Sequence, residues 1–539
     1  MTFEIKDRDL AGRIGKIKTK NGVIETPAFF PVINPIKNII PIKAYNEKFR
    51  IRNIITNAYI IKNAYDRGLL QIKDLHELLD FKEIIMTDSG AYQILTYGKV
   101  NLKPTEIIEL QEQLNSDIAV ILDIPTPREA SKNTAAKTVE RTLKNAAKSI
   151  KTITRKDIIW IGPVQGGKHL ELVKKCAKEI GEMDFQMHGI GGPTQFMETY
   201  KFEELVDIII TAKRNLPLER PVHLFGAGHP ILLPILVALG CDTFDSASYI
   251  LYAKDDRYIT SNGTTKLSKL QYLPCNCPIC RRYDAEEMRK MSKKEREQLL
   301  AEHNLWKIIQ EMKKIKQAIV EGSLWELIEQ KAKSHPQLYN AILRLSKYKS
   351  YLEEFDPITK GQNKGVFYTT SEGLIRPEVT RHINKLRYNV RFPGKEILLL
   401  MPEQRSKPYH KNKKVRRLIS KIEEKLREDT SSVHICIYGI PFGIIPLEID
   451  EVHPLSQHEK ARLKDINAEY IIIEALEALI SNNNYKKALI IFNKDVQITN
   501  KTIRNMLEIL ETHNIIASAI ETNKEDEIIA KIMKIKREK

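Results

Sequence analysis

The sequence lacks both a long hydrophobic run and a secretion signal. No apolar stretch is long enough to cross a bilayer, and charged residues already interrupt residues 1–10, where a signal peptide would be apolar. Internal repeats and low-complexity tracts are also missing, so a repeat architecture is not expected. Hydrophobic residues make up 42% of the chain and charged residues 29%, as in folded globular proteins. We therefore expect a folded cytoplasmic protein with no membrane association.

Cysteine is scarce, with six in 539 residues. Cys275, Cys277 and Cys280 lie within six residues of one another, and the other three are scattered along the chain. This distribution excludes a disulfide framework and indicates one metal site plus ordinary buried thiols.

Acidic residues are outnumbered by basic ones. The 86 Lys and Arg against 69 Asp and Glu give a net charge of +17. Such an excess favours a polyanionic partner, most commonly nucleic acid, although the Lys-rich surface of a thermophilic protein explains it equally well. The length is too great for one compact core and predicts two to four domains.

Short apolar runs alternate with amphipathic helical stretches through the first 250 residues. Strands separated by helices form parallel β-α units. Eight such strands favour a closed (β/α)₈ barrel, with a doubly wound open sheet as the alternative. The expected strands are residues 27–32, 53–56, 84–87, 118–122, 158–164, 185–190, 222–225 and 241–244, and residues 104–114 and 135–152 are two of the expected helices.

Polar or glycine-rich residues follow six of these eight strands. In a barrel the carboxyl ends of all strands surround one mouth, where active sites are built. The sequence therefore predicts the functional site at this mouth. The six strand ends carry Asp88, Asp123, Gln165, Gly191-Gly192, Gly226-Ala227-Gly228-His229 and Asp245.

The three clustered cysteines have the spacing C-x-C-x₂-C, and His303 follows on an amphipathic helical stretch. Three thiolates and one imidazole complete the closed tetrahedral shell of a structural zinc site. His229 and His335 are alternative fourth ligands, and a catalytic zinc with an open position is the alternative function.

Two carboxylates are the candidate chemical groups. Asp88 lies in Asp88-Ser-Gly90-Ala-Tyr92, where Gly90 allows close approach of a ligand and Tyr92 offers a stacking face for a planar base. Asp245 lies in a similar Asp-Ser-Ala segment. Facing carboxylates suit chemistry at a sugar anomeric carbon, where one attacks C1′ and the other handles the proton of the leaving group.

These segments together resemble the tRNA-guanine transglycosylases. The similar segments occur in the order and spacing of that family over about residues 1–340, and a large C-terminal extension is typical of its archaeal branch, the 7-cyano-7-deazaguanine tRNA-ribosyltransferases. They are residues 87–93, 122–123, 164–167 and 244–247, the set Cys275, Cys277, Cys280 and His303, and, more loosely, residues 190–192.

The resemblance implies a tRNA substrate in which a D-arm guanine, position 15 in the family, is exchanged for 7-cyano-7-deazaguanine through a covalent tRNA–aspartyl intermediate, in archaeosine biosynthesis. Asp245 resembles the nucleophile and Asp88 the general acid/base, although the two roles could be exchanged. Asp123 and Gln165 would read the edge of the base, and the backbone of Gly191, Gly192 and Pro193 would close the pocket. The resemblance further implies free guanine as product, one structural Zn²⁺ per chain, no redox or nucleotide cofactor, and a homodimer through the zinc region.

The remaining chain predicts further domains. We expect a barrel at residues 1–265, a zinc-binding subdomain with helices completing the barrel at 266–345, a connecting region at 346–394 and an α/β region at 395–539. Residues 403–409 and 438–446 resemble archaeosine synthase, but Pro402 is followed by Glu403 where that enzyme has a cysteine. We therefore expect a tRNA-docking region that has lost the synthase chemistry. A PUA-type RNA-binding domain is not apparent, so a separate PUA-type chain is a candidate partner.

Three other classes of function compete. A non-catalytic tRNA-binding paralogue is disfavoured because Asp88 and Asp245 are both present. An archaeosine synthase-like amide-group transferase is disfavoured by Glu403, and a zinc hydrolase by the fourth zinc ligand.

Overall fold

The computed structural model describes residues 3–71, 73–92, 103–360, 362, 364–462, 466–493 and 498–537. The chain divides into two compact units, one formed by Met1–Lys347 with Phe355–Gln362 and the other by Tyr348–Glu354 with Asn363–Lys539. Within the described residues, no helix is both long and apolar enough to span a membrane.

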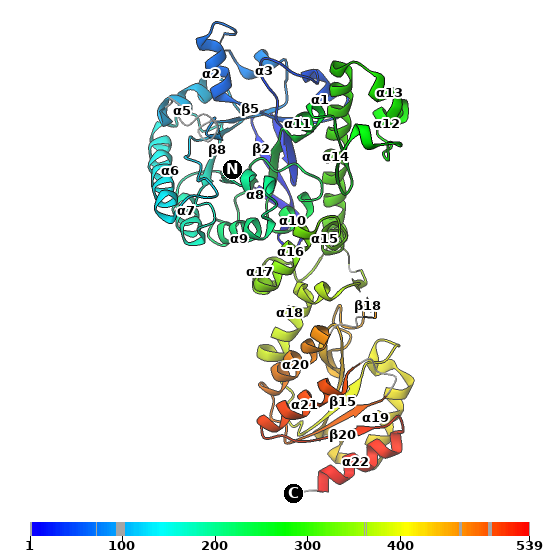
Figure 1. The fold of residues 1–539 in the computed structure, drawn as a ribbon. Helices are drawn as coiled ribbons and strands as arrows, with labels where there is room; N and C mark the ends of the chain where they lie inside the picture. Colours follow the sequence, from blue (N-terminus) through cyan, green and yellow to red (C-terminus); the bar gives the residue numbers. More distant parts are fainter. Residues whose placement is uncertain are drawn as a thin grey trace. The chain divides into compact units, whose positions relative to one another are not determined.

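The first unit contains a barrel of eight parallel strands with helices around its outside (Figure 1). Each strand pairs with the next along the chain, β11 pairs with β4, and a bridge between Val32 and Ile55 joins β4 to β5. A doubly wound sheet would reverse its strand order near the middle, so the predicted (β/α)₈ barrel is confirmed. The strands are β4 (Ala28–Pro31), β5 (Asn53–Asn57), β6 (Ile84–Asp88), β7 (Ile118–Val120), β8 (Ile159–Val164), β9 (Met187–Ile190), β10 (Val222–Leu224) and β11 (Thr243–Ser246).

Helices connect these strands as the amphipathic stretches predicted. The two expected helices are α5 (Pro104–Gln113) and α6 (Lys132–Thr152), and Ser131 caps the second by accepting a hydrogen bond from the Thr134 N–H. Further described helices between or after the barrel strands are α1 (Ile42–Glu47), α2 (Ala58–Asp66), α3 (Leu75–Leu79), α7 (Leu170–Glu182), α8 (Thr194–Glu198), α9 (Phe202–Lys213), α10 (Leu233–Ala238) and α11 (Ser248–Lys254).

Apolar side chains fill the barrel interior. Ile84 and Met86 of β6 and Ile159 and Ile161 of β8 belong to one buried cluster. Successive side chains of a strand point to opposite faces, so this alternation carries Asp88 and, beyond β8, Gln165 to the inward side at the mouth.

A three-stranded antiparallel sheet precedes the barrel and was not predicted. It consists of β1 (Phe3–Asp9), β2 (Gly12–Thr19) and β3 (Gly22–Glu25). Ile17 and Ile24 join the interior cluster, so the sheet covers the amino-terminal end of the barrel. Its exposed face carries charged residues, as in β1, FEIKDRD, and these hide the strand signal in the sequence.

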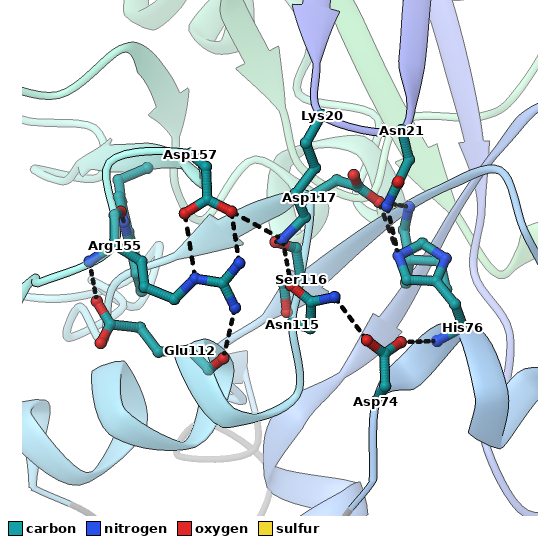
Figure 2. Close-up of polar contacts among 12 residues, drawn as sticks. Lys20, Asn21, Asp74, His76, Glu112, Asn115, Ser116, Asp117, Arg155 and Asp157 are labelled. Carbon is teal, nitrogen blue, oxygen red and sulfur yellow. Dashed lines mark hydrogen bonds and ion pairs between the residues drawn. The ribbon is translucent and has the colours of Figure 1, made fainter.

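A polar network lies at this amino-terminal end (Figure 2). Lys20, in the turn between β2 and β3, donates to Asn115 Oδ1 at 2.6 Å and to the Ser116 carbonyl at 2.9 Å. Asp117, buried just before β7, accepts from the Ile85 N–H at 2.8 Å, and His76 lies 3.3 Å from it. Polar groups at this end of a (β/α)₈ barrel serve stability rather than chemistry.

The zinc-region elements follow the barrel within the same unit. A hairpin of β12 (Arg257–Thr260) and β13 (Gly263–Lys266) leads to α12 (Pro278–Arg282), α13 (Ala285–Lys290) and the long α14 (Lys293–Glu321). Helix α14 packs against α11 and β12. Ser292 and Glu295 form its capping box, and Gly322 ends it with a φ of 68°.

The second unit contains a five-stranded sheet in the order β17-β16-β15-β19-β20, in which only β17 is antiparallel to its neighbour. The α/β alternation predicted beyond residue 395 is thereby confirmed. The strands are β15 (Ile397–Pro402), β16 (Val433–Gly439), β17 (Gly443–Pro446), β19 (Lys487–Phe492) and β20 (Ile516–Glu521), and the main helices are α19 (Lys413–Leu426), α20 (Ile466–Ile480), α21 (Asn500–Thr512) and α22 (Glu525–Arg537).

Candidate active site at the barrel mouth

Asp88 ends β6 on the inward side of the barrel. Asn57, at the end of the neighbouring strand β5, donates from Nδ2 to Asp88 Oδ2 at 2.9 Å. The Asn57 Oδ1 accepts from the Ile60 N–H and so caps α2. The helix cap fixes the amide of Asn57, and this amide in turn fixes the orientation of the Asp88 carboxyl group.

The environment of Asp88 favours its protonated form. Burial raises the pKa of Asp88 to about 7, and the charges of Asp123 and Asp245 act in the same direction. Backbone N–H groups of Gly90 and Ser89 oppose this rise without cancelling it. The site therefore holds three carboxyl groups within electrostatic reach, one of which titrates near neutral pH.

Asp123 and Gln165 form a buried pair beyond β7 and β8. Gln165 Nε2 donates to Asp123 Oδ2 at 2.5 Å, and its Oε1 accepts from the Thr126 N–H at 2.9 Å. Burial raises the pKa of Asp123 to about 6, against the hydrogen bond from Gln165. An amide nitrogen has two hydrogens. Gln165 therefore has one N–H left to donate to a ligand, next to the Asp123 carboxyl group, which can accept.

The segment after β9 lies against this pair. A Cβ at Gly191 would lie 2.1 Å from Gln165 Nε2, so only glycine leaves room for the amide. Gly192 has a φ of 74°, and Pro193 precedes α8 as its N-cap. The structure thus brings Gly191, Gly192 and Pro193 to the mouth, where the sequence predicted them.

Asp245 lies within β11 on the opposite side of the mouth and is buried. Two groups contact one of its oxygens: His223 Nε2 lies 3.0 Å from Oδ1, and the Gly226 N–H donates to Oδ1 at 2.9 Å. Gly226 adopts a φ of 71°, which suits glycine and directs its N–H at the carboxylate. The strand continues two residues beyond the predicted end at 244, because β11 pairs with β4 through Ser246.

Tyr92 lies on the segment after Asp88 and is 46% exposed. Burial raises the pKa of Tyr92, and the charge of Glu198 in α8 acts in the same direction. Gln93, the last residue of the Asp88 motif, lies outside the described residues.

The cysteine cluster and His303 converge beside α14. The ligand atoms of Cys275, Cys277, Cys280 and His303 all lie within 4.8 Å of one another. His303 Nδ1 lies 3.4 Å from Cys277 Sγ and 3.3 Å from Cys280 Sγ, while its Nε2 contacts the Ile259 carbonyl at 2.9 Å. The backbone contact orients the imidazole so that Nδ1 faces the sulfurs, as in zinc sites with a supported histidine.

The two alternative histidines lie elsewhere. His229 packs beside Tyr252, and His335 stacks on Tyr200 with ring centroids 4.7 Å apart. The three sulfurs and one imidazole fit a tetrahedral Zn²⁺ with no position left for substrate.

Glu403, singled out in the sequence, directly follows β15 in the second unit. It forms ion pairs with Lys460 and Lys407 and accepts from the Tyr409 hydroxyl at 3.3 Å. Burial alone would raise the pKa of Glu403, but hydrogen bonds from His458 and Lys460 lower it to about 2. This position therefore holds a paired anion, which is a poor substitute for a cysteine nucleophile.

Two residues of the site were not predicted. Asn57 is the polar residue that ends β5. The rule that polar residues at strand ends mark the site applied to this strand too, but it was not used there. His223 lies between apolar residues in Val222–Leu224, and nothing in the sequence distinguished it from an ordinary core histidine.

Comparison with known proteins gives consistent matches. A family model described as queuine tRNA-ribosyltransferase matches residues 8–337, and a model described as a domain of unknown function matches residues 379–535. A tRNA-guanine(15) transglycosylase of Methanocaldococcus jannaschii is 41% identical over 501 residues, which cover 90% of this chain and 73% of that protein. Proteins of the same name from Sulfolobus acidocaldarius and Saccharolobus solfataricus are 41% and 42% identical, over 91% of this chain and 95% and 96% of theirs.

Proposed function

Because this chain belongs to the tRNA-guanine transglycosylase family, we propose that it exchanges the guanine at position 15 of tRNA for 7-cyano-7-deazaguanine. The observation that supports this most directly is the pairing of unlike carboxyl groups at one mouth. Asp88 has its pKa raised to about 7, whereas Asp245 receives hydrogen bonds on one oxygen. Carboxyl groups in unlike environments take separate roles as acid/base and nucleophile.

The reaction then proceeds in two displacements. An Asp245 oxygen forms a bond to C1′ as the bond from C1′ to the guanine nitrogen breaks, and the protonated Asp88 gives its proton to the departing guanine. The incoming base then attacks C1′ through its ring nitrogen and gives the proton of that nitrogen to Asp88, and the electron pair of the C1′–oxygen bond returns to Asp245. This assignment gives each aspartate the role that its environment supports.

The base pocket consists of Asp123, Gln165 and the glycine segment. The Asp123 carboxylate accepts from N–H groups on the edge of the base, and the remaining hydrogen of Gln165 Nε2 donates to the base carbonyl. Tyr92 provides a stacking face. The target guanine must leave its stack to enter this pocket, as in other enzymes that act on a base.

Exchange of labelled guanine into unmodified tRNA tests the proposal. The chain should incorporate labelled guanine, and an excess of unlabelled 7-cyano-7-deazaguanine should displace the label from the tRNA. A chain that binds tRNA but exchanges no base would be the non-catalytic paralogue, and an amide-group transfer to modified tRNA would indicate the synthase.

The raised pKa of Asp88 predicts that replacing this residue lowers activity but raises the free energy of unfolding at high pH. Between pH 4 and 7 the folded protein binds more protons than the unfolded chain, whose Asp titrates near 3.8. The free energy of unfolding therefore falls as pH rises through this window. Asp88→Asn removes this titration while its amide oxygen still accepts from Asn57. We expect the variant to be inactive yet more stable than the parent at pH 8, by about 2 kcal/mol after allowance for partial exposure.

Thermal unfolding of both chains at pH 4.5 and pH 8 measures this difference. The stabilisation should be much smaller at pH 4.5, where Asp88 is protonated in the folded parent. A variant that is less stable than the parent at both values would contradict the raised pKa.

We propose that exposed cations of the second unit bind the tRNA backbone. Lys413, Lys414 and Arg416 are exposed on α19. Their replacement by glutamate should weaken tRNA binding and reduce the slope of log affinity against log salt by about 2–3, because each lost phosphate contact lowers the counterion release. Binding of the free base should not change, since its pocket lies in the barrel.

A control with three similar substitutions keeps this test specific. Lys137, Arg141 and Lys148 are exposed on α6 of the barrel, and their replacement by glutamate changes net charge equally. Equal effects of the two triple variants would mean that only overall charge matters. No effect of the α19 variant would favour a separate PUA-type chain as the source of affinity.

A further inference from the structure

His223 is buried on β10 and contacts the proposed nucleophile, Asp245. Its Nε2 lies 3.0 Å from Asp245 Oδ1, and its Nδ1 lies 2.9 Å from the Thr243 hydroxyl. The registers of β10 and β11 place His223 directly opposite Thr243. Thr243 and Asp245 are two residues apart on one strand, so both side chains point to the interior beside the imidazole.

The contact with Asp245 indicates which ring nitrogen carries a hydrogen. A carboxylate oxygen only accepts hydrogen bonds, so Nε2 carries the hydrogen that lies between His223 and Asp245. In the neutral imidazole Nδ1 then has none, and it accepts from the Thr243 hydroxyl. Phe30 and Phe225 contact the ring edge-on, at 6.2 Å and 4.6 Å between centroids, and restrict its rotation.

Both donors to Asp245 bind the same oxygen. His223 and the Gly226 N–H contact Oδ1, and among the hydrogen bonds of the described residues none is donated to Oδ2. The carboxylate is thus held by one oxygen, and the other is left to react.

We propose that His223, oriented by Thr243, is a positioning residue that makes Oδ2 of Asp245 the oxygen that attacks C1′. This inference rests on the proposed function. In the first displacement the Oδ2–C1′ bond forms, and Oδ1 becomes the carbonyl oxygen of the aspartyl ester. In the second displacement the Oδ2–C1′ bond breaks, and negative charge returns to a carboxylate whose Oδ1 already has two donors. The donors therefore stabilise the departing carboxylate when the incoming base attacks.

Four single variants of the full-length chain test this role. His223→Leu removes the donor, His223→Gln retains an amide N–H at the same distance along the side chain, and Thr243→Val removes the hydroxyl that orients the ring. His188→Leu is the matched control: His188 is equally buried, on the adjacent strand β9, and neither of its ring nitrogens has a hydrogen-bond partner among the described residues.

The first readout is the rate at which the incoming base consumes a preformed, denaturation-resistant tRNA adduct, the step in which negative charge returns to Asp245. A hydrogen bond to a charged group has an effect of about 10- to 100-fold, and we expect His223→Leu to slow this step by about that factor without changing tRNA affinity. His223→Gln should recover most of the rate, and Thr243→Val should lie between the parent and His223→Leu. Equal losses in His223→Leu and His188→Leu, or no recovery with Gln, would overturn the proposal in favour of a packing role.

The second readout does not depend on catalysis. In the free protein labelled with ¹⁵N-histidine, the resonance removed by His223→Leu should be that of an imidazole protonated at Nε2 and unprotonated at Nδ1, and Thr243→Val should alter it. A ring protonated only at Nδ1 would overturn the proposal even in an active enzyme. A parent chain that shows the expected tautomer but exchanges no base would instead refute the proposed function alone.

Discussion

Chains carrying Asp245→Asn or Asp245→Ala will form no denaturation-resistant adduct with tRNA and will lose guanine exchange by more than about 10³-fold, because the covalent route is removed. The Asn variant distinguishes loss of chemistry from loss of packing better than the Ala variant does. Its amide oxygen still accepts from His223 and from the Gly226 N–H, so the surrounding contacts at 3.0 and 2.9 Å can persist. An amide is nonetheless a very poor nucleophile, so the loss isolates the chemistry from the packing.

The adduct assay separates the two aspartates. Asp88→Asn should also lose exchange. Because this variant retains Asp245, the proposed nucleophile, an adduct should still accumulate slowly with a tRNA whose leaving base needs no proton. Trapping by Asp245→Ala together with no trapping by Asp88→Ala would reverse the two roles. Thermal unfolding of each variant serves as the control that the barrel is folded.

Loss of the metal should have the second large effect, on stability rather than on chemistry. Binding free energy at a closed Cys₃His site contributes directly to folding free energy, which for structural zinc amounts to about 10 kcal/mol or more in small domains. Cys277→Ser and His303→Gln should therefore lower the unfolding temperature of the barrel unit and reduce the zinc content from about one per chain. Residual exchange activity measured well below the unfolding temperature should remain.

A histidine that was a candidate ligand provides the control. His335 stacks on Tyr200 and caps α16 (Pro336–Arg344) through Nδ1. His335→Asn retains a capping oxygen and should leave zinc content and unfolding temperature nearly unchanged. Full stability in a chelator-treated, zinc-free chain would contradict a structural role of the metal.

The sequence predicted the barrel because its strands show a clear periodic pattern of apolar residues. Ile84, Met86, Ile159 and Ile161 alternate with residues that face the helices, and polar or glycine residues follow six of the eight predicted strands. Asp88, Asp123, Gln165 and Asp245 could be singled out in this way because a polar residue at the end of an apolar run is conspicuous. The cysteine spacing indicated the metal cluster for a similar local reason.

Contacts between strands could not be recognised from the sequence. His223 is defined by its register opposite Thr243 and by the oxygen of Asp245 that it reaches, and neither relation can be obtained from residues taken one segment at a time. The sheet of β1, β2 and β3 was missed because its charged outer face resembles a loop. Only pairing with the barrel end gives its inner residues, Ile17 and Ile24, a buried role.

The polar network at the amino-terminal end of the barrel affects how this molecule can evolve. Strand β7 has the buried Asp117 just before it and the base-reading candidate Asp123 just after it, and these carboxyl groups lie at opposite ends of the same short strand. Strand β8 is arranged alike, with Asp157 paired to Arg155 at its start and Gln165 at its end. Residues that hold the fold and the residues proposed to select the base are thus separated along both strands. A lineage can alter its base preference at the mouth while the opposite end continues to maintain the barrel.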